Sequence, residues 1–110
     1  MSRTVVVGKV GSLGLGRAKK IYVRDRRIAV FNDSGTLRAV DDLCTHSGGS
    51  LSEGSCEDGV VTCPWHGARF RLDDGQGLGP PAYRRLQTYP VRVANGMITV
   101  AVDLDLDVDD

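Results

Sequence analysis

The chain has 110 residues, which is enough for one domain with a modest hydrophobic core. Its 14 Lys and Arg balance its 14 Asp and Glu, and no aromatic platform of a nucleic-acid-binding surface accompanies the basic residues. The longest apolar runs, such as Val5–Val7 and Ile28–Phe31, are far shorter than the roughly 20 residues that span a bilayer. The N-terminus has no apolar stretch of signal-peptide length. We therefore expect a soluble, cytoplasmic monomer that binds neither membrane nor nucleic acid.

Short runs of β-branched and aromatic residues, punctuated by Gly, Asp and Asn, predict antiparallel strands throughout the chain. The expected strands are Val5–Val10, Lys20–Arg24, Ile28–Asn32, Arg38–Asp41, Val60–Thr62, Phe70–Leu72, Tyr89–Val93 and Met97–Val102. Turns are expected near Gly14–Gly16, Asp25–Arg27 and Asp33–Gly35. Asn95-Gly96 predicts a tight hairpin because both residues tolerate positive φ. Sustained helical periodicity is missing, so the expected fold class is all-β.

Glycines near the N-terminus raise the question of a nucleotide site. The order in Gly11-Ser-Leu-Gly14-Leu-Gly16 is G-x-x-G-x-G, whereas a dinucleotide-binding loop has G-x-G-x-x-G. Residues 17–23 also resemble a turn and a strand rather than the helix that such a loop needs. We interpret this segment as a loop.

The middle of the chain differs from both ends in composition. Residues 41–83 are rich in Gly, Ser and Pro, whereas residues 1–40 and 84–104 carry most of the expected strands. We therefore expect one domain, 1–110, with a loop-rich subdomain of about 41–83 inserted in a β scaffold. Residues 1–42 have nine basic and four acidic side chains, and residues 43–110 have five basic and ten acidic ones. The acidic tail, 103–110, is either a solvated end or a face that steers docking to a basic partner.

Two Cys–His pairs lie in that central segment. The chain has two histidines and three cysteines, and Cys44-Thr-His46 and Cys63-Pro-Trp-His66 are separated by sixteen residues. Three interpretations compete: structural turns without metal, a structural zinc site, and a [2Fe–2S] cluster in which two His replace two Cys. Zinc fingers pair Cys with Cys and His with His, so the mixed pairs favour the cluster. The remaining Cys56 has irregular spacing and is expected to be a packed or half-exposed thiol.

The residues around the pairs resemble a known family. Cys44-Thr-His46-Ser-Gly-Gly-Ser-Leu-Ser-Glu-Gly54 and Cys63-Pro-Trp-His66-Gly-Ala-Arg-Phe70 are similar to the cluster-binding signature of Rieske proteins. The resemblance implies the Rieske fold, an antiparallel β-sandwich-like scaffold with a small loop-rich cluster-binding subdomain. It also implies one Rieske-type [2Fe–2S] cluster, with Cys44 and Cys63 on one iron and His46 and His66 on the other. Pro80-Pro81 resembles the proline loop that covers the cluster.

Four neighbouring residues separate this chain from the respiratory cytochrome bc-type members of the family. Those members have an additional disulfide, and the positions of its two cysteines match Gly49 and Trp65 here. They also have two hydroxyl donors near the cluster, at positions that match Ala68 and Phe70. Replacement of Cys by His makes the oxidised cluster neutral and raises its potential, whereas the lack of hydroxyl donors lowers it. We therefore expect a potential near the lower end of the Rieske range, on the order of −150 mV. Trp65 either shields the cluster by packing or contacts a partner.

The closest resemblance is to the ferredoxin component of bacterial aromatic-ring dioxygenase systems. It implies a one-electron carrier without catalysis of its own, which passes electrons from an NAD(P)H-dependent flavoprotein ferredoxin reductase to a terminal oxygenase. The alternatives are the small Rieske subunit of an assimilatory nitrite reductase and a structural zinc module that binds a partner.

Overall fold

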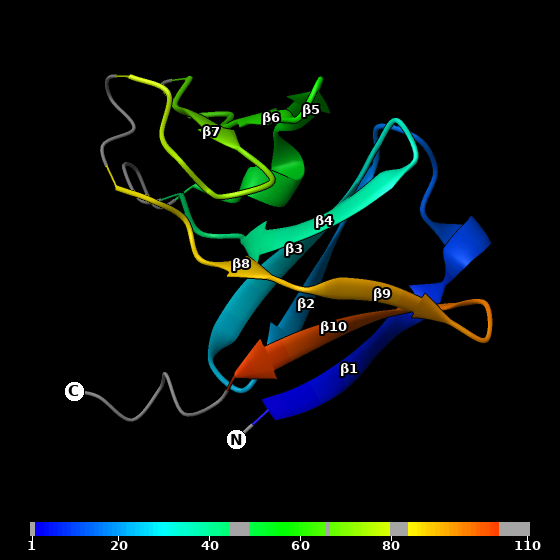
Figure 1. Ribbon diagram of the computed structural model, residues 1–110. Helices are drawn as coiled ribbons and strands as arrows, with labels where there is room; N and C mark the ends of the chain where they lie inside the picture. The colour runs from blue at the N-terminus through cyan, green and yellow to red at the C-terminus, as the bar shows by residue number, and fades with distance from the viewer. Residues whose placement is uncertain (1, 45–48, 66, 80–83, 104–110) are drawn as a thin grey trace.

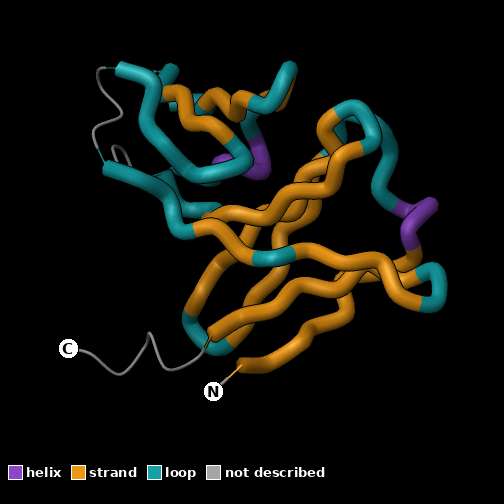
Figure 2. Tube along the Cα trace, viewed as in Figure 1, coloured by secondary structure: helices purple, strands orange, loops and turns teal. Residues whose placement is uncertain are grey.

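The computed structural model describes residues 2–44, 49–65, 67–79 and 84–103. Within these ranges the chain is built from short strands and two single turns of 3₁₀ helix, as Figures 1 and 2 show. The elements are β1 (Ser2–Lys9), η1 (Val10–Ser12), β2 (Ala18–Val23), β3 (Arg26–Asp33), β4 (Thr36–Asp41), η2 (Leu51–Glu53), β5 (Ser55–Glu57), β6 (Val60–Thr62), β7 (Arg69–Arg71), β8 (Thr88–Tyr89), β9 (Val91–Ala94) and β10 (Met97–Asp103). The predicted all-β class is confirmed.

The strands form three antiparallel sheets, in the orders β1-β10-β9, β2-β3-β4-β8 and β5-β6-β7. The first two sheets pack against each other and make the scaffold at the bottom of Figure 1, while the third sheet lies above them. Inward-facing side chains of β10 alternate with half-exposed ones, since one face of its sheet is covered. The scaffold core contains Val7, Leu13, Val23, Ile28, Val30, Ala39, Tyr89, Ile98, Val100 and Val102.

The sheet that contains β3 is covered on both faces. Ile28 and Val30 point into the scaffold core, whereas Ala29 and Phe31 point into a second core under the third sheet. All four are at most 1 % exposed. Successive strand residues face opposite sides, so a strand buried on both sides needs an unbroken apolar run. This run therefore marks the middle layer of the molecule, which supports the third sheet and the loops around it.

The structure corrects several expected boundaries. The strand expected at Tyr89–Val93 is two strands, because Pro90 separates β8 in one sheet from β9 in another. The strand β5 was not expected at all. The turn expected at Asp25–Arg27 begins one residue earlier, where Arg24 adopts positive φ (58°), and β3 already starts at Arg26.

Other local expectations hold. Asn95 and Gly96 both have positive φ (53° and 76°) in the hairpin between β9 and β10. A turn occurs at Gly14–Gly16, where the Arg17 amide donates to the Gly14 carbonyl at 3.1 Å, and the strand β2 follows rather than a helix. Among the described residues, no helix has the length and apolar character needed to cross a membrane.

Candidate metal centre

The first predicted ligand loop leaves β4 and returns at η2. Its two stems are joined by a β-bridge between Leu43 and Ser50, and the Cys44 amide donates to the Gly49 carbonyl at 2.9 Å. These contacts hold the Cys44 side chain inward, and only 2 % of it is exposed. His46, the second predicted ligand of this loop, lies outside the described residues.

The second predicted ligand loop is the turn between β6 and β7. The Cys63 amide donates to the Ala68 carbonyl at 2.7 Å, which closes the turn, and Cys63 is 1 % exposed. The Trp65 amide points back at the Cys63 sulfur, with N···Sγ of 3.4 Å. An amide in this position stabilises negative charge on a thiolate. His66 lies outside the described residues.

Gly49 brings the two loops together. A methyl group on its Cα would lie 3.3 Å from the Cys63 sulfur and 3.2 Å from Cγ of the Trp65 ring. The ring therefore packs on the first loop at the position where bc-type members are expected to carry a disulfide. Cys44 and Cys63 also belong to the same buried core. Two buried thiols on adjacent tight loops, one of them facing an amide donor, fit a site that binds thiolate-ligated metal.

A buried carboxylate supports the first loop from below. Asp42 is fully buried, and it accepts hydrogen bonds from the Ser50 hydroxyl and from the Ser52 amide (2.7 Å). The Lys20 ammonium lies 3.7 Å away. Burial alone would raise the pKa of Asp42, but the two serines and Lys20 hold it below its ordinary value. Because the Asp42 carbonyl also accepts the Leu51 amide at 2.7 Å, this residue closes the loop by both backbone and side chain.

A second polar group ties the end of β4 to the scaffold. The Tyr89 hydroxyl donates to the Asp41 carboxylate, and Arg26 donates to the Tyr89 oxygen at 3.0 Å. Burial, assisted by the bond to Asp41, raises the pKa of Tyr89. Burial also raises the pKa of Asp41, although Tyr89 and Arg26 oppose that shift. The hydrogen-bonded group fixes the strand from which the first ligand loop departs.

Two glycines allow close backbone approach near the site. A methyl group on Gly54 would lie 2.0 Å from the Thr62 carbonyl oxygen, and one on Gly75 would lie 2.2 Å from the Leu86 carbonyl oxygen. Both distances are far below van der Waals contact. Gly54 thus lets η2 pack directly against the strand that leads into Cys63. Sequence reasoning missed Asp42, Gly54 and Gly75, since their importance depends on residues far away in the chain.

The residues singled out beside the ligand pairs also have definite places. Ala68 and Phe70 are fully buried in the core that contains both cysteines. Cys56 lies in β5, half-buried against the same core, and burial together with the Asp33 charge raises the pKa of its thiol. A raised pKa disfavours the reactive thiolate, which agrees with the packed role expected for Cys56. The predicted cover at Pro80-Pro81 lies outside the described residues.

The fold and these loops define a β domain in which two loops with buried thiols offer a site for a metal centre. The model of the Rieske [2Fe-2S] domain family matches residues 3–90, so the chain belongs to this family and its cofactor is one Rieske-type [2Fe–2S] cluster. The resemblance seen in the sequence is confirmed.

Comparison with known proteins gives close relatives. The chain is 46 % identical over 89 residues to the 3-phenylpropionate/cinnamic acid dioxygenase ferredoxin subunit of Photorhabdus laumondii, covering 79 % of this chain and 83 % of the relative. It is structurally similar to a chain in the complex of oxygenase and ferredoxin of carbazole 1,9a-dioxygenase (TM-score 0.84, 29 % identity, 89 % and 92 % covered). It is similar to the same degree to a protein from Mycobacterium tuberculosis described as the small subunit of an NADH-dependent nitrite reductase (TM-score 0.84, 29 % identity, 94 % and 97 % covered).

Proposed function

We propose that the chain is the ferredoxin component of an aromatic-ring dioxygenase system. It is an electron carrier that serves an oxygenase, and it is not itself an enzyme. The further proposal is that it receives electrons singly from an NAD(P)H-dependent flavoprotein ferredoxin reductase in the cytoplasm and acts as a monomer. The observation that carries the proposal is the 46 % identity to a dioxygenase ferredoxin subunit, together with the burial of both thiols, Cys44 and Cys63, in one core.

We assign the cluster ligands as Cys44 and Cys63 on one iron and His46 and His66 on the other. The burial of both thiols and the amide of Trp65 at the Cys63 sulfur support the thiolate half of this assignment. The family motif supports the imidazole half. When bound, the cluster accepts and releases one electron.

The side chains near the thiols also support a low potential. Ala68 and Phe70 are buried where bc-type members are expected to have hydroxyl donors, and neither can donate a hydrogen bond to sulfur. The amide of Trp65 donates to the Cys63 sulfur at 3.4 Å. Since neither of these two positions supplies a hydroxyl donor to stabilise the reduced cluster, the potential is expected on the order of −150 mV.

A nitrite reductase small subunit is the second candidate. The structural similarity to the Mycobacterium tuberculosis protein equals the structural similarity to the dioxygenase ferredoxin chain, so structure alone favours both candidates equally. The higher sequence identity to dioxygenase ferredoxin subunits, 46 %, decides for the first. A zinc module disagrees with the family match.

The test measures cluster content first and electron delivery second. The purified chain should be red-brown, and Cys44→Ser and Cys63→Ser should each abolish the colour, while Cys56→Ser should retain it. The dithionite-reduced chain should then be reoxidised by the terminal oxygenase of the Photorhabdus laumondii system with coupled oxidation of 3-phenylpropionate. Colour without reoxidation by this oxygenase, but with reoxidation by a sirohaem nitrite reductase, would select the second candidate. A colourless protein that contains zinc would refute both.

A further inference from the structure

The peptide unit that joins Pro64 to Trp65 lies against the sulfur of Cys63. The Trp65 amide donates to the Cys63 Sγ atom with an N···S distance of 3.4 Å. Hydrogen bonds to the sulfur atoms of an iron–sulfur cluster stabilise its reduced form and help to set its potential. A side chain that holds this peptide unit in place therefore affects the potential even without contact to the cluster.

The first ligand loop and η2 support this peptide unit from two sides. On the Trp65 side, a methyl group placed on Gly49 would lie 3.2 Å from Cγ of the indole ring and 3.3 Å from the Cys63 sulfur. On the other side, a methyl group on Gly54 would lie 3.2 Å from Cδ of Pro64. The ring and the proline therefore both rest closely on the backbone of the preceding segment.

The hydrogen bond that closes the second turn leaves the orientation of this peptide unit open. The Cys63 amide donates to the Ala68 carbonyl at 2.7 Å, which joins the two ends of the turn. The same ends are compatible with opposite orientations of an inner peptide unit, as type I and type II turns show. A ring that packs on Gly49 is placed to select the orientation in which the Trp65 amide faces the sulfur.

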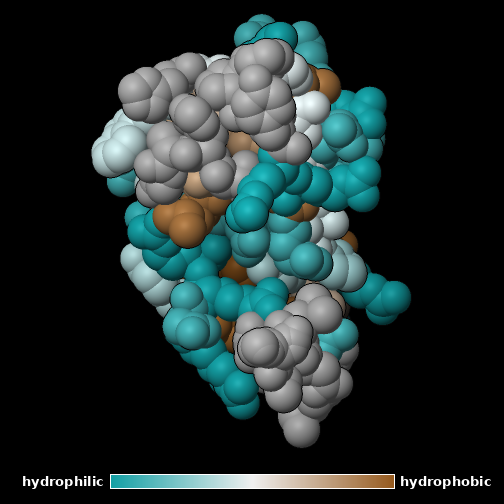
Figure 3. Space-filling model, turned by 90° about the vertical axis from the view of Figure 1, so that its left-hand side faces the viewer, coloured by the Kyte–Doolittle hydropathy of each residue, from teal (hydrophilic) through white to brown (hydrophobic). Residues whose placement is uncertain are grey.

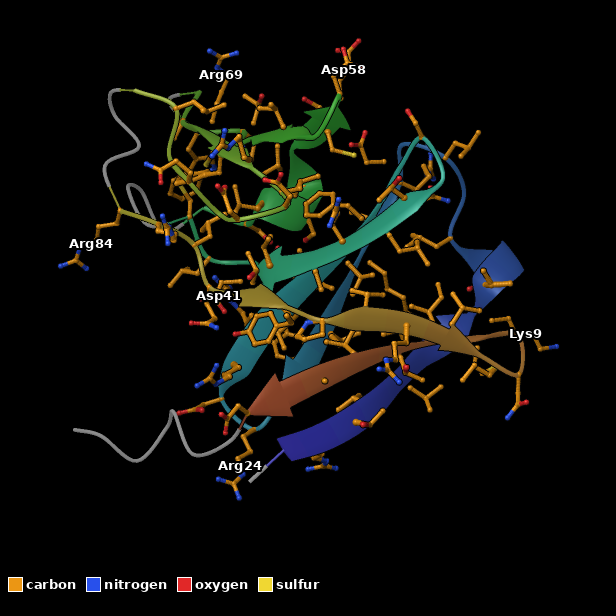
Figure 4. All side chains as sticks on the ribbon, in the orientation of Figure 1. Lys9, Arg24, Asp41, Asp58, Arg69 and Arg84 are labelled. Carbon is orange, nitrogen blue, oxygen red and sulfur yellow. The ribbon has the colours of Figure 1, made fainter. Side chains whose placement is uncertain are left out.

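Trp65 keeps most of its surface in solvent. It is 57 % exposed, whereas an aromatic side chain that served only as a cover would bury most of its ring. Figure 3 shows the side of the molecule on which the ligand loops lie, and the described atoms there are mainly hydrophilic. Figure 4 marks this end of the third sheet by Arg69, which pairs with Thr62, and the opposite end by Asp58. The ring therefore has its defined contact at Gly49 rather than in a wider apolar surface.

We propose that Trp65 is a positioning residue for electron transfer, whose ring packs on Gly49, holds its own amide against the Cys63 sulfur and so raises the potential of the cluster. The proposal rests on the proposed function, because it requires Cys63 to be a ligand of the electron-carrying cluster. It gives Trp65 a role other than the two expected from the sequence, which were shielding of the cluster and contact with a partner.

The three roles of Trp65 differ in the sign of one measurement. Loss of a hydrogen bond to sulfur lowers the potential, because the reduced cluster loses a stabilising donor. Removal of an apolar shield raises the potential, because water stabilises the additional negative charge of the reduced cluster. Removal of a residue that only contacts a partner leaves the potential of the free carrier unchanged.

The first experiment is a redox titration of Trp65→Ala and Trp65→Phe. Trp65→Ala should have a lower midpoint potential, with a ratio of reduced to oxidised cluster roughly three- to tenfold lower at a fixed ambient potential, as for one weakened hydrogen bond. Trp65→Phe keeps an aromatic ring on Gly49, so its potential should stay near the wild-type value. A higher or unchanged potential in Trp65→Ala would overturn the proposal, and so would an equal fall in both variants.

A matched control removes an exposed aromatic ring from the scaffold. Tyr22 is 64 % exposed on β2, at the edge of its sheet, and Tyr22→Ala should keep the wild-type potential. The visible spectrum shows which variants retain the cluster. The predicted acidic tail does not enter this comparison, since its first residue, Asp103, ends β10 in the scaffold and residues 104–110 lie outside the described ranges.

The second experiment detects the amide directly. The chain has one tryptophan, so tryptophan labelled with ¹⁵N at its α-amino group, supplied to an auxotroph, marks the peptide nitrogen of Trp65. Pulsed electron paramagnetic resonance of the reduced protein should show a hyperfine coupling to this nitrogen. Gly49→Ala keeps the ring but its methyl group displaces it, so the coupling should weaken and the potential should fall. If this variant loses the cluster, the titrations of Trp65→Ala and Trp65→Phe decide.

Failure of this proposal is distinguishable from failure of the proposed function. If Cys63→Ser retains its colour, the ligand assignment itself is wrong. If Cys63→Ser is colourless but the wild type shows no coupling to the Trp65 nitrogen, the positioning role alone is overturned. Delivery of electrons to the oxygenase is measured separately, and neither the titration nor the coupling depends on it.

Discussion

The buried carboxylate of Asp42 makes the sharpest prediction about stability. It accepts two hydrogen bonds at the base of the first ligand loop, from the Ser50 hydroxyl and the Ser52 amide, and faces Lys20 at 3.7 Å. Asp42→Asn keeps one carbonyl oxygen but replaces the other acceptor by an NH₂ group and removes the charge. A hydrogen bond to a charged group contributes about 1.5–3 kcal/mol. The partly exposed ion pair with Lys20 adds up to about 1 kcal/mol.

The expected destabilisation of Asp42→Asn is therefore about 1.5–4 kcal/mol, a large part of the roughly 5–15 kcal/mol that holds a small domain together. Under anaerobic conditions, the visible absorbance and the far-UV circular dichroism should be lost at roughly 1–2 M lower urea than in the wild type. The absorbance should bleach first, because the weakened loop carries Cys44, a proposed cluster ligand. Both signals are needed, since a protein with a tightly bound cofactor does not unfold in two states.

The matched control is Asp58→Asn, which removes the same charge from an exposed turn residue. Asp58 has φ of 52°, a conformation that Asn also adopts readily, so backbone strain is not introduced. This control should unfold at the same urea concentration as the wild type. If Asp42→Asn were equally stable, the reasoning that the buried carboxylate organises the first ligand loop would be refuted.

Three further predictions follow from the geometry. Gly54→Ala should prevent cluster retention, because its methyl group would overlap a backbone carbonyl at 2.0 Å. Gly11→Ala, with open space around it, should retain the cluster. Equal colour in both variants would contradict the close packing of Gly54. Burial raises the pKa of Tyr89, so its protonated form stabilises the fold below pH ~10, and this stability is lost as pH rises through the folded pKa. Because Tyr89 stays protonated in the folded chain at pH ~11, Tyr89→Phe should leave the phenolate absorbance at that pH unchanged. Ala68→Ser with Phe70→Tyr should raise the midpoint potential in a redox titration, and an unchanged value would show that these positions do not face the sulfurs.

The parts of the fold that the sequence predicts are those coded by neighbouring residues. Asn95-Gly96 encodes its hairpin through two residues that tolerate positive φ, and the apolar run 28–31 encodes a strand buried on both faces. The strand β5 was missed because Ser55-Cys56-Glu57 has no apolar alternation; pairing with Val60–Thr62 makes it a strand. Its existence depends on the tertiary context, which a local pattern does not contain.

The candidate site shows the same division. The spacing of Cys44 and Cys63 relative to the histidines was sufficient to predict a cluster, because ligand residues on tight turns leave a local signature. Asp42 was not predicted, since its partners Ser50 and Lys20 are distant in sequence and serine is common in loops. Its burial is decided by how the first ligand loop folds over β2, and only the structure gives that arrangement.

The contact of Trp65 with Gly49 has a consequence for how the two loops come apart. A disulfide in this place would open only by reduction, whereas an aromatic ring resting on a glycine opens by thermal motion alone. Thiol reductants should therefore leave the closure of the site unchanged, and the iron and sulfide can enter without any prior oxidation of the chain. Removal of the ring should instead speed the loss of iron to a chelator, so that the lifetime of the cofactor is governed by packing rather than by the redox state of the surroundings.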